Sequence, residues 1–546
     1  TLMRSSAASD VYKRQVYEYD LRGFTVHGGK IMYSESFSAA VCGIDGCVVH
    51  VEADISDGLP GLILVGYLSS EVKEARERVR IALKNSGYRF PPKKITINLS
   101  PADIRKDGTS FDLSIAVAIL AAFGYIDKTF LKQSLFIGEL SLDGKIKSVN
   151  GVLPRVYTAY ENGFKYCIVP KDNIPEAEIV SKINIIGVSN LNEMLDIINS
   201  GKIDEHISKD ELDISIFADG TDVDFSDIKG QAGAKRAVEA AVSGMHNIAL
   251  IGAPGTGKTM IAQSIPGIMP KLTFSERMEL SKIYSVSGLL NEQMPVVVKR
   301  PFRAPHHTIT QTALAGGGKY PKPGELSLAS CGVLFLDELP EFNRQTLEVM
   351  RQPLEEGYVN VSRLEGSCRY PAKFQLTAAL NPCKCGYYPD RKRCSCTQMQ
   401  IKNYLGRVSK PLLDRIDIFT ETVVLKYNEI NGNEKAESSE EIRKRVENVH
   451  YIQKRRYEKE GIIFNSQLQA GMIKKYCVME SEAKDFLELT FDTLDFSARA
   501  YHKVLKIART LADMDESSII KKEHISEALC YRSADKKYWR WQNVDE

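Results

Sequence analysis

Apolar positions along residues 32–202 follow two alternating patterns. Short apolar runs at 95–99 and 166–169 are typical of buried strands, whereas residues 71–85 carry their apolar positions at helical spacing. The longest apolar stretch, residues 113–126, is shorter than the roughly 18–20 apolar residues needed to cross a bilayer. It predicts a buried helix and no membrane span. Together the patterns predict a mixed α/β domain over 32–202.

The rest of the chain divides into three segments. Residues 203–224 are acidic and poor in apolar side chains, which predicts a solvated linker. Residues 225–432 alternate strand and helix patterns, and residues 433–546 are almost wholly helical. One helix of this last segment has an apolar face, formed by Tyr501, Val504, Leu505, Ala508, Leu511 and Ala512.

The composition of the chain and its first residues narrow the possible interpretations of the sequence. Residues 1–31 begin with Thr1 and show no clear period, so we expect a non-native or disordered extension. The chain is 43% hydrophobic and 26% charged, which is typical of a soluble globular protein. Its net charge of +2 means that any nucleic-acid surface must be a local patch. The cysteines outside 383–396 are scattered singly, which favours reduced thiols and a cytoplasmic protein.

A phosphate-binding loop follows a predicted buried strand at 247–251. The segment matches G-x-x-x-x-G-K-[ST], and a predicted helix starts at its lysine. Glycines let backbone N–H groups surround phosphates, and the helix N-terminus favours negative charge. We expect Lys258 to reach the β- and γ-phosphates of ATP and Thr259 to ligate Mg²⁺. The nucleotide-binding residues are then Gly252, Ala253, Pro254, Gly255, Thr256, Gly257, Lys258 and Thr259.

A second predicted strand, residues 333–336, ends in two carboxylates about eighty residues after this loop. Asp337 is expected to hold Mg²⁺ with Thr259, and Glu338 to polarise the attacking water. Two solvated acids at a strand end are the alternative. The combination with the phosphate loop favours ATP hydrolysis.

Four cysteines crowd into the short segment 383–396, which also carries basic and tyrosine side chains. Four thiolates that close on one centre suit tetrahedral Zn²⁺, although C-x-C spacing is tighter than the usual spacing of zinc ligands. A zinc-bound knuckle could touch nucleic acid, and unmetallated thiols in a loop are the alternative. The candidate ligands are Cys383, Cys385, Cys394 and Cys396.

From residue 32 to its end, the chain resembles the YifB/ComM family of magnesium-chelatase-like AAA+ ATPases. The resemblance rests on R-P-F-R-A-P-H-H at 300–307, P-G-E-L-S-L-A at 323–329, R-Q-P-L-E-E-G at 351–357 and L-L-D-R-I-D at 412–417. It implies an α/β fold: an AAA+ P-loop core with a parallel sheet in three α/β/α layers. A Lon-protease-like (ChlI-type) domain precedes the core, and a helical lid follows it.

The same resemblance assigns further catalytic residues. Asn381 is similar to the sensor that orients water, and Arg499 to a second sensor on the lid. Arg415 resembles an arginine finger that reaches ATP in a neighbouring subunit, which implies a homo-hexamer. Surface ion pairs are the alternative for both arginines. A predicted β-hairpin, residues 358–362 returning through 369–370, resembles the pore hairpins that touch DNA in related motors.

Residues 106–110, K-D-G-T-S, resemble the nucleophile segment of Lon-type proteases, with Ser110 at the nucleophile position. Leu153 occupies the position of the family's catalytic lysine. A serine without a base is a poor nucleophile, so we expect a scaffold or binding module and not a peptidase.

The leading hypothesis is an ATP-hydrolysing ring motor that remodels DNA, by branch migration or helicase-like movement, in recombination or transformation. It rests on the family resemblance and on local basic elements. A chelatase-type subunit that drives metal insertion into a tetrapyrrole is the second hypothesis. An ATP-dependent Lon-like protease is the third, and Leu153 opposes it.

Overall fold

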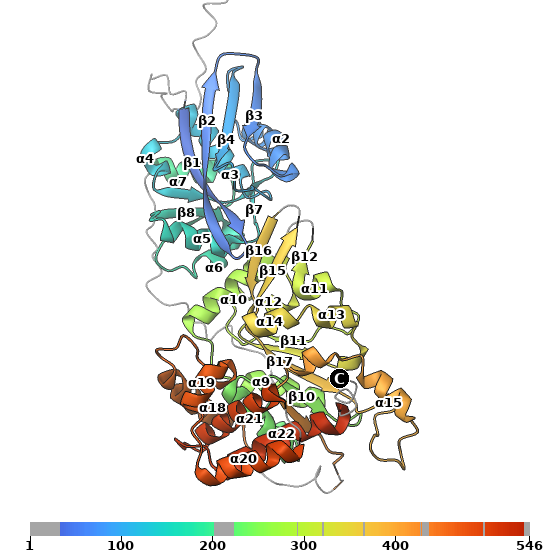
Figure 1. Ribbon diagram of the computed structural model, residues 1–546. Helices are drawn as coiled ribbons and strands as arrows, with labels where there is room; N and C mark the ends of the chain where they lie inside the picture. The colour runs from blue at the N-terminus through green and yellow to red at the C-terminus, as the bar shows by residue number, and fades with distance from the viewer. Residues whose placement is uncertain are drawn as a thin grey trace, which may run out of the picture.

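The computed structural model arranges the chain as three blocks, one after another along the molecule (Figure 1). The N-terminal block lies at one end, the helical C-terminal block at the other, and the phosphate-loop core between them. The expected extension 1–31 and nearly all of the expected linker 203–224 lie outside the described residues. Those residues are 33–200, 223–291, 293–318, 321–363, 366–425, 427, 436–494 and 497–539.

The N-terminal block is built on a seven-stranded sheet of order β3-β4-β2-β1-β5-β8-β9. The long β1 and β2 pair antiparallel from Tyr33 opposite Asp54 to Cys42 opposite Asp45, and β2 pairs antiparallel with β4. The other neighbours run parallel. Its strands are β1 (Tyr33–Cys42), β2 (Asp45–Ser56), β3 (Gly61–Val65), β4 (Lys94–Ser100), β5 (Ser134–Phe136), β8 (Tyr166–Pro170) and β9 (Asn184–Val188), with a separate pair β6 (Glu139–Leu140) and β7 (Ile146–Lys147).

Helices cover this sheet, and the most buried is α3 (Asp112–Ala122), in which every residue is buried. The prediction of a buried helix there is confirmed. Helix α2 begins after Ser69, whose side chain accepts a hydrogen bond from the Val72 amide, as N-caps do. The remaining helices are α2 (Ser70–Asn85), α4 (Lys128–Leu131), α5 (Val152–Glu161), η1 (Lys171–Asn173), α6 (Ile174–Ala177) and α7 (Leu191–Ser200).

The core is a five-stranded parallel sheet of order β11-β14-β17-β10-β18, which confirms the predicted fold class. Ile248 and Leu250 of β10 belong to one hydrophobic cluster, and Ala249 and Ile251 to another on the opposite face. This alternation places helices on both faces, in three layers. The strands are β10 (Ile248–Ile251), β11 (Phe302–Arg303), β14 (Val333–Leu336), β17 (Gln375–Leu380) and β18 (Ile418–Glu421).

Short elements surround this sheet, and the predicted hairpin forms among them. The strands β15 (Tyr358–Arg363) and β16 (Gly366–Pro371) pair antiparallel, with Asn360 opposite Arg369. A second small pair joins β12 (Gly316–Gly317) to β13 (Lys322–Pro323). The helices are η3 (Phe225–Asp227), α8 (Ala232–Gly244), α9 (Lys258–Ile268), α10 (Phe274–Ser287), α11 (Gln311–Ala315), α12 (Glu325–Leu328), η4 (Leu339–Glu341), α13 (Arg344–Glu348), α14 (Arg351–Glu356), α15 (Gln398–Leu405) and α16 (Lys410–Leu413).

The C-terminal block is helical, as predicted, and packs against α8 and α9 of the core. Helix α21 (Ala498–Met514) buries the predicted apolar positions Val504, Leu505, Ala508, Leu511 and Ala512. In the described part of the chain, no helix is both long and apolar enough to cross a membrane. The other helices are α18 (Ser439–Arg456), η5 (Asn465–Gln467), α19 (Ala470–Tyr476), α20 (Ser481–Leu494) and α22 (Lys522–Trp539).

Helix α10 joins the N-terminal block to the core. Its Ser285 donates a hydrogen bond to the buried Glu176, and the Ser285 carbonyl accepts one from the Gly151 amide at 3.1 Å. Nearby, the Lys282 ammonium lies 3.0 Å from Asp45. These polar contacts are partly or fully buried, so they fix the orientation of the block on the core.

Candidate functional site

The phosphate loop connects β10 to α9 at the carboxyl edge of the parallel sheet. Gly255 and Gly257 adopt positive φ angles of 78° and 84°, which non-glycine residues rarely adopt. The ammonium of Lys258 donates to the carbonyl oxygens of Gly252 and Ala253, at 2.8 and 2.9 Å. Its third partner is the side-chain oxygen of Asn381, at 3.1 Å. The loop thus turns around a lysine held by three oxygen acceptors.

The two predicted carboxylates lie at the same carboxyl edge of the sheet, where β14 ends. Thr259 donates a hydrogen bond to Asp337 at 3.2 Å, so the hydroxyl and the carboxylate predicted to hold Mg²⁺ are neighbours. Hydroxyl and carboxylate oxygens are ligands that Mg²⁺ accepts. Burial lowers the pKa of Lys258, and the nearby charges of Asp337 and Glu338 oppose this effect. The donor set fits a magnesium-bound triphosphate.

Glu338 faces solvent next to this set. It has a left-handed backbone with φ of 52°, an uncommon conformation for a residue other than glycine. Its carboxylate lies 3.8 Å from Nδ1 of His307. Strained residues of this kind cluster at functional sites, which fits the predicted role of Glu338 in activating water.

The two predicted arginines both lie at the segment 411–415. Arg415 donates to the Pro411 carbonyl at 2.7 Å and pairs with Glu355. The exposed Arg499 lies 3.3 Å from Asp414, the residue before Arg415. Both make ion pairs, as the alternative interpretation expected, so their roles as finger and sensor stay predictions.

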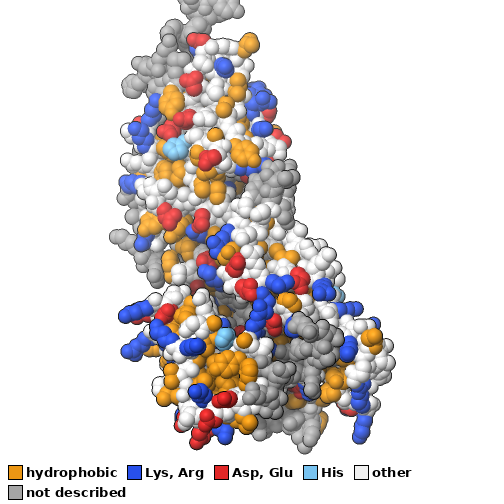
Figure 2. Space-filling model, in the orientation of Figure 1, with side chains coloured by type: hydrophobic (Ala, Val, Ile, Leu, Met, Phe, Trp, Pro, Cys, Tyr) orange, Lys and Arg blue, Asp and Glu red, His pale blue; other side chains and the backbone are white. Residues whose placement is uncertain are grey.

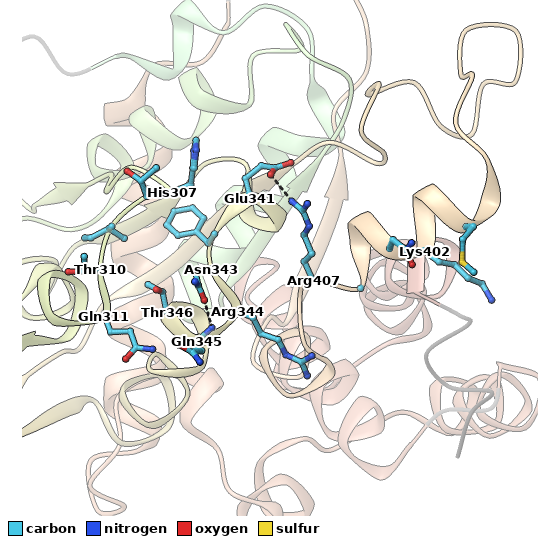
Figure 3. Close-up of a pocket in the computed structure, with 16 residues that line it drawn as sticks. His307, Thr310, Gln311, Glu341, Asn343, Arg344, Gln345, Thr346, Lys402 and Arg407 are labelled. Carbon is cyan, nitrogen blue, oxygen red and sulfur yellow. Dashed lines mark hydrogen bonds and ion pairs between the residues drawn. The ribbon is translucent and has the colours of Figure 1, made fainter.

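An open hollow of about 1170 Å³ has His307, whose ring lies 3.8 Å from the Glu338 carboxylate, in its wall (Figure 3). It is lined by the segment that follows β11, by residues 341–346, and by α15 with Arg407. In Figure 3, Arg407 points toward Glu341, and the two form an ion pair of 2.7 Å. Sequence reasoning missed this hollow because three segments distant in the sequence form it. Only the R-P-F-R-A-P-H-H motif marked one of its walls.

The four cysteines converge, as zinc binding requires. Cys383 Sγ lies 3.3 Å from Cys385 Sγ and 3.7 Å from Cys394 Sγ, and the Cys385–Cys394 separation is 3.6 Å. A tetrahedron with Zn–S bonds of about 2.3 Å has S···S edges near 3.8 Å. Burial acts to raise the pKa of Cys385, but hydrogen bonds from the Tyr387 amide and the neighbouring thiols outweigh it and lower the pKa to about 6. The donor set therefore fits Zn²⁺, with Cys396 as the fourth ligand.

The Lon-like segment lacks a catalytic pair. The buried Oγ of Ser110 has no hydrogen-bond partner among the described residues. Lys106, the basic residue closest to it in sequence, donates instead to the carbonyls of Pro101 and Ile104. Leu153 is fully buried. This geometry supplies no base to Ser110, in keeping with a scaffold.

Comparison with known proteins places all three blocks in one group. Residues 51–173 match the family "Subunit ChlI of Mg-chelatase", residues 224–430 match "Magnesium chelatase, subunit ChlI", and residues 436–532 match its C-terminal family. The chain is 40% identical to "Competence protein ComM" of Haemophilus influenzae, over 91% of this chain and 97% of that protein. It is 40% identical to "Uncharacterized protein YifB" of Escherichia coli, over 91% and 96%. A "Lon protease" of Trichlorobacter lovleyi is 26% identical over 28% of this chain and 20% of its own length.

Proposed function

The chain belongs to the YifB/ComM family of magnesium-chelatase-like AAA+ ATPases, and we propose that it hydrolyses ATP in a ring and uses the energy to remodel DNA. The observation that carries the ATPase proposal is the convergence of Lys258 with Asn381 and of Thr259 with Asp337, at 3.1 and 3.2 Å. These contacts join the ends of three neighbouring parallel strands at one site, where nucleotides bind in open α/β sheets.

In the proposed mechanism, each side chain has a separate task. Lys258 and the amides of the phosphate loop bind the phosphates and neutralise their charge. Thr259 and Asp337 hold Mg²⁺, which supplies further charge neutralisation when bound. Glu338 accepts a proton from the attacking water, and Asn381 orients that water. The exposed carboxylate of Glu338 has room for this water on its solvent side.

The site requires a neighbour to complete it. Among the described residues, Arg415 pairs with Glu355 and donates to the Pro411 carbonyl of its own chain. We infer that it acts on ATP bound by the next subunit of a homo-hexamer and stabilises charge in the transition state.

The DNA proposal rests on a local feature, because the net charge of the whole chain is only +2. Figure 2 shows Lys and Arg side chains interspersed with Asp and Glu along the molecule. On the hairpin, the exposed Arg369 stacks over the Tyr358 ring, 3.3 Å from its centre. An arginine and an aromatic ring together offer phosphate and base contacts. The name "Competence protein ComM" of a relative supports a DNA substrate in transformation.

We further propose that the four cysteines of residues 383–396 bind Zn²⁺.

ATP turnover with and without DNA tests this proposal. The protein is assayed alone and with single-stranded, duplex and four-way-junction DNA, with Lys258→Ala as the blank. We expect turnover to rise with DNA and most with junctions. Turnover unchanged by every DNA would reject the DNA substrate, and metallation of a porphyrin or cleavage of casein would then identify the chelatase or the protease alternative.

A further inference from the structure

The four-cysteine loop, residues 383–396, contacts two other parts of the molecule. It starts two residues after Asn381, which accepts a hydrogen bond from Lys258. Gly386 packs directly on the phosphate loop: a Cβ placed on it would collide with Cδ of Pro254 and lie 2.9 Å from its Cγ. Tyr388 packs its ring 6.1 Å from that of Tyr538 in the last helix of the lid. The loop therefore lies between the phosphate loop and the lid.

A metal ion held by the four thiolates would set the shape of this loop. Cys383 and Cys394 are its buried positions in the hydrophobic cluster, whereas residues 389–393 are exposed. The backbone hydrogen bonds of the loop are local, such as Gly386 to Cys383 at 2.9 Å and Cys394 to Asp390 at 2.8 Å. Four thiolates this close repel one another unless a cation neutralises them. A bound metal ion would thus tie the four thiolates together and help to keep Gly386 in place.

On the lid side, further contacts extend the one between Tyr388 and Tyr538. Tyr538 is followed by Trp539, whose indole N–H donates to the Leu405 carbonyl at 3.2 Å, at the end of α15. Helix α15 begins right after the last cysteine, and Thr397 caps its N-terminus. The terminal helix α22 of the lid therefore contacts both the four-cysteine loop, through Tyr388, and helix α15, which follows the loop directly.

We propose that the metal-bound cysteine loop braces the phosphate loop through Gly386 and Pro254, so that zinc occupancy controls the affinity for ATP. The inference rests on the zinc and ATP sites of the proposed function. Zinc here is a structural ion outside the reaction, and Gly386 is a positioning residue that acts through Pro254. Loss of the ion would let the four-cysteine loop move, and Pro254 of the phosphate loop would then lose its contact with Gly386.

Gly386→Ala separates the contact from the metal ligands. The added methyl group meets Pro254, and the φ of +87° adds strain. Gly163→Ala is the matched control, because Gly163 has φ of +77° and nothing within 4 Å of an added Cβ. We expect Gly386→Ala to keep one zinc per chain and to bind a fluorescent ATP analogue about tenfold more weakly. The control should bind zinc and nucleotide like the wild type.

Removal of the metal tests the second part of the proposal, that ATP affinity depends on bound zinc. The double variant Cys385→Ser/Cys396→Ser, and wild type treated with a zinc chelator in excess Mg²⁺, should lose zinc and show the same weaker binding. Added Zn²⁺ should restore binding in the chelated wild type only. Circular dichroism and thermal melting of each protein would show that it is folded.

The possible outcomes distinguish a failure of this inference from a failure of the proposed ATPase function. Zinc-free protein or Gly386→Ala with wild-type affinity for ATP would overturn the brace while leaving the ATPase intact. Wild type with well under one zinc per chain would overturn both the zinc site and the brace. Wild type that binds no ATP at all would overturn the proposed function itself.

Discussion

Two hydrogen bonds define the proposed nucleotide site at the scale of residues. Lys258 reaches Asn381 and Thr259 reaches Asp337, although these pairs are separated by 123 and 78 positions in the sequence. The phosphate-loop pattern and the paired acids could be predicted from sequence, because their residue types and spacing follow from phosphate and metal chemistry. The contact of Gly386 with Pro254 could not, because an isolated glycine in a loop does not indicate which atoms approach it.

Replacement of Glu338 tests the proposed general base. Glu338→Gln should bind ATP like the wild type and hydrolyse it at least about 100-fold more slowly, since an amide cannot accept the proton from water. Steady-state phosphate release and equilibrium binding of a labelled nucleotide measure the two quantities. Glu440→Gln, at an exposed position of α18, is the control that should change neither. Wild-type turnover in Glu338→Gln would refute the assignment.

Replacement of Arg415 tests whether the finger acts between subunits. Arg415→Ala alone should lose turnover by about 10³-fold, the contribution typical of an arginine finger. A mixture of Arg415→Ala with Lys258→Ala should recover part of it, because some interfaces then combine an intact phosphate loop with an intact arginine. Phosphate release is measured as a function of the mixing ratio. Failure to recover turnover in mixed rings would contradict action in trans.

At the scale of elements, a mostly buried ionic group joins β18 of the core to α21 of the lid. The Asp417 carboxylate lies 3.3 Å from Lys503 and 3.2 Å from the ring of the buried His246. Burial acts to raise the pKa of Asp417, but the charge of Lys503 and the hydrogen bond from His246 outweigh it and hold the pKa well below its usual range. The lid is thus attached electrostatically as well as by its apolar face.

Loss of this group should destabilise the protein. Asp417→Asn removes the anionic partner of Lys503, whose ammonium also donates to the Ile416 carbonyl, and breaking such a pair costs about 3–5 kcal/mol of unfolding free energy. Because the folded pKa is depressed, the contribution is complete above the unfolded pKa of about 3.9 and is lost as pH falls toward the folded value. Urea unfolding should therefore show a gap between wild type and variant that is constant at neutral pH and narrows below about pH 4. Asp485→Asn, at an exposed position, is the control, and an equal effect there would contradict the account.

The hairpin of β15 and β16 should act on DNA and not on ATP. Arg369→Ala should leave basal turnover unchanged, weaken DNA binding and lower the slope of log affinity against log salt by about 1, as expected for one lost phosphate contact. Fluorescence anisotropy at several salt concentrations gives that slope. Arg89→Ala, on the exposed surface of the N-terminal block, serves as the control. An unchanged slope in Arg369→Ala would remove the hairpin from the DNA interface.

Sequence patterns predicted elements better than they predicted contacts between elements. The continuous apolar stretch 113–126 identified α3, which is buried on every side, and the helical period of its apolar face identified α21. The contact of Glu176 with Ser285, and the hollow that His307 lines, join surfaces of distant segments and leave no such period. The C-x-C pairs predicted a four-sulfur cluster, because the thiols lie within one short segment.

At the scale of the whole molecule, the structure connects the ATP site with every other block. The lid packs on α8 and α9, the cysteine loop lies against Pro254, and α10 carries the N-terminal block. A change at the phosphate loop therefore has direct contacts through which to move the lid and the knuckle.

The most direct test of the central claim is ATP-driven disruption of a labelled four-way DNA junction. The wild-type chain with ATP and Mg²⁺ is compared with Lys258→Ala, with Glu338→Gln, and with wild type given a non-hydrolysable analogue. We predict that only the wild type with ATP converts the junction into duplex arms, at a rate that follows its ATP turnover. Junctions that persist in the wild type at saturating ATP, despite measurable hydrolysis, would contradict a DNA-remodelling motor.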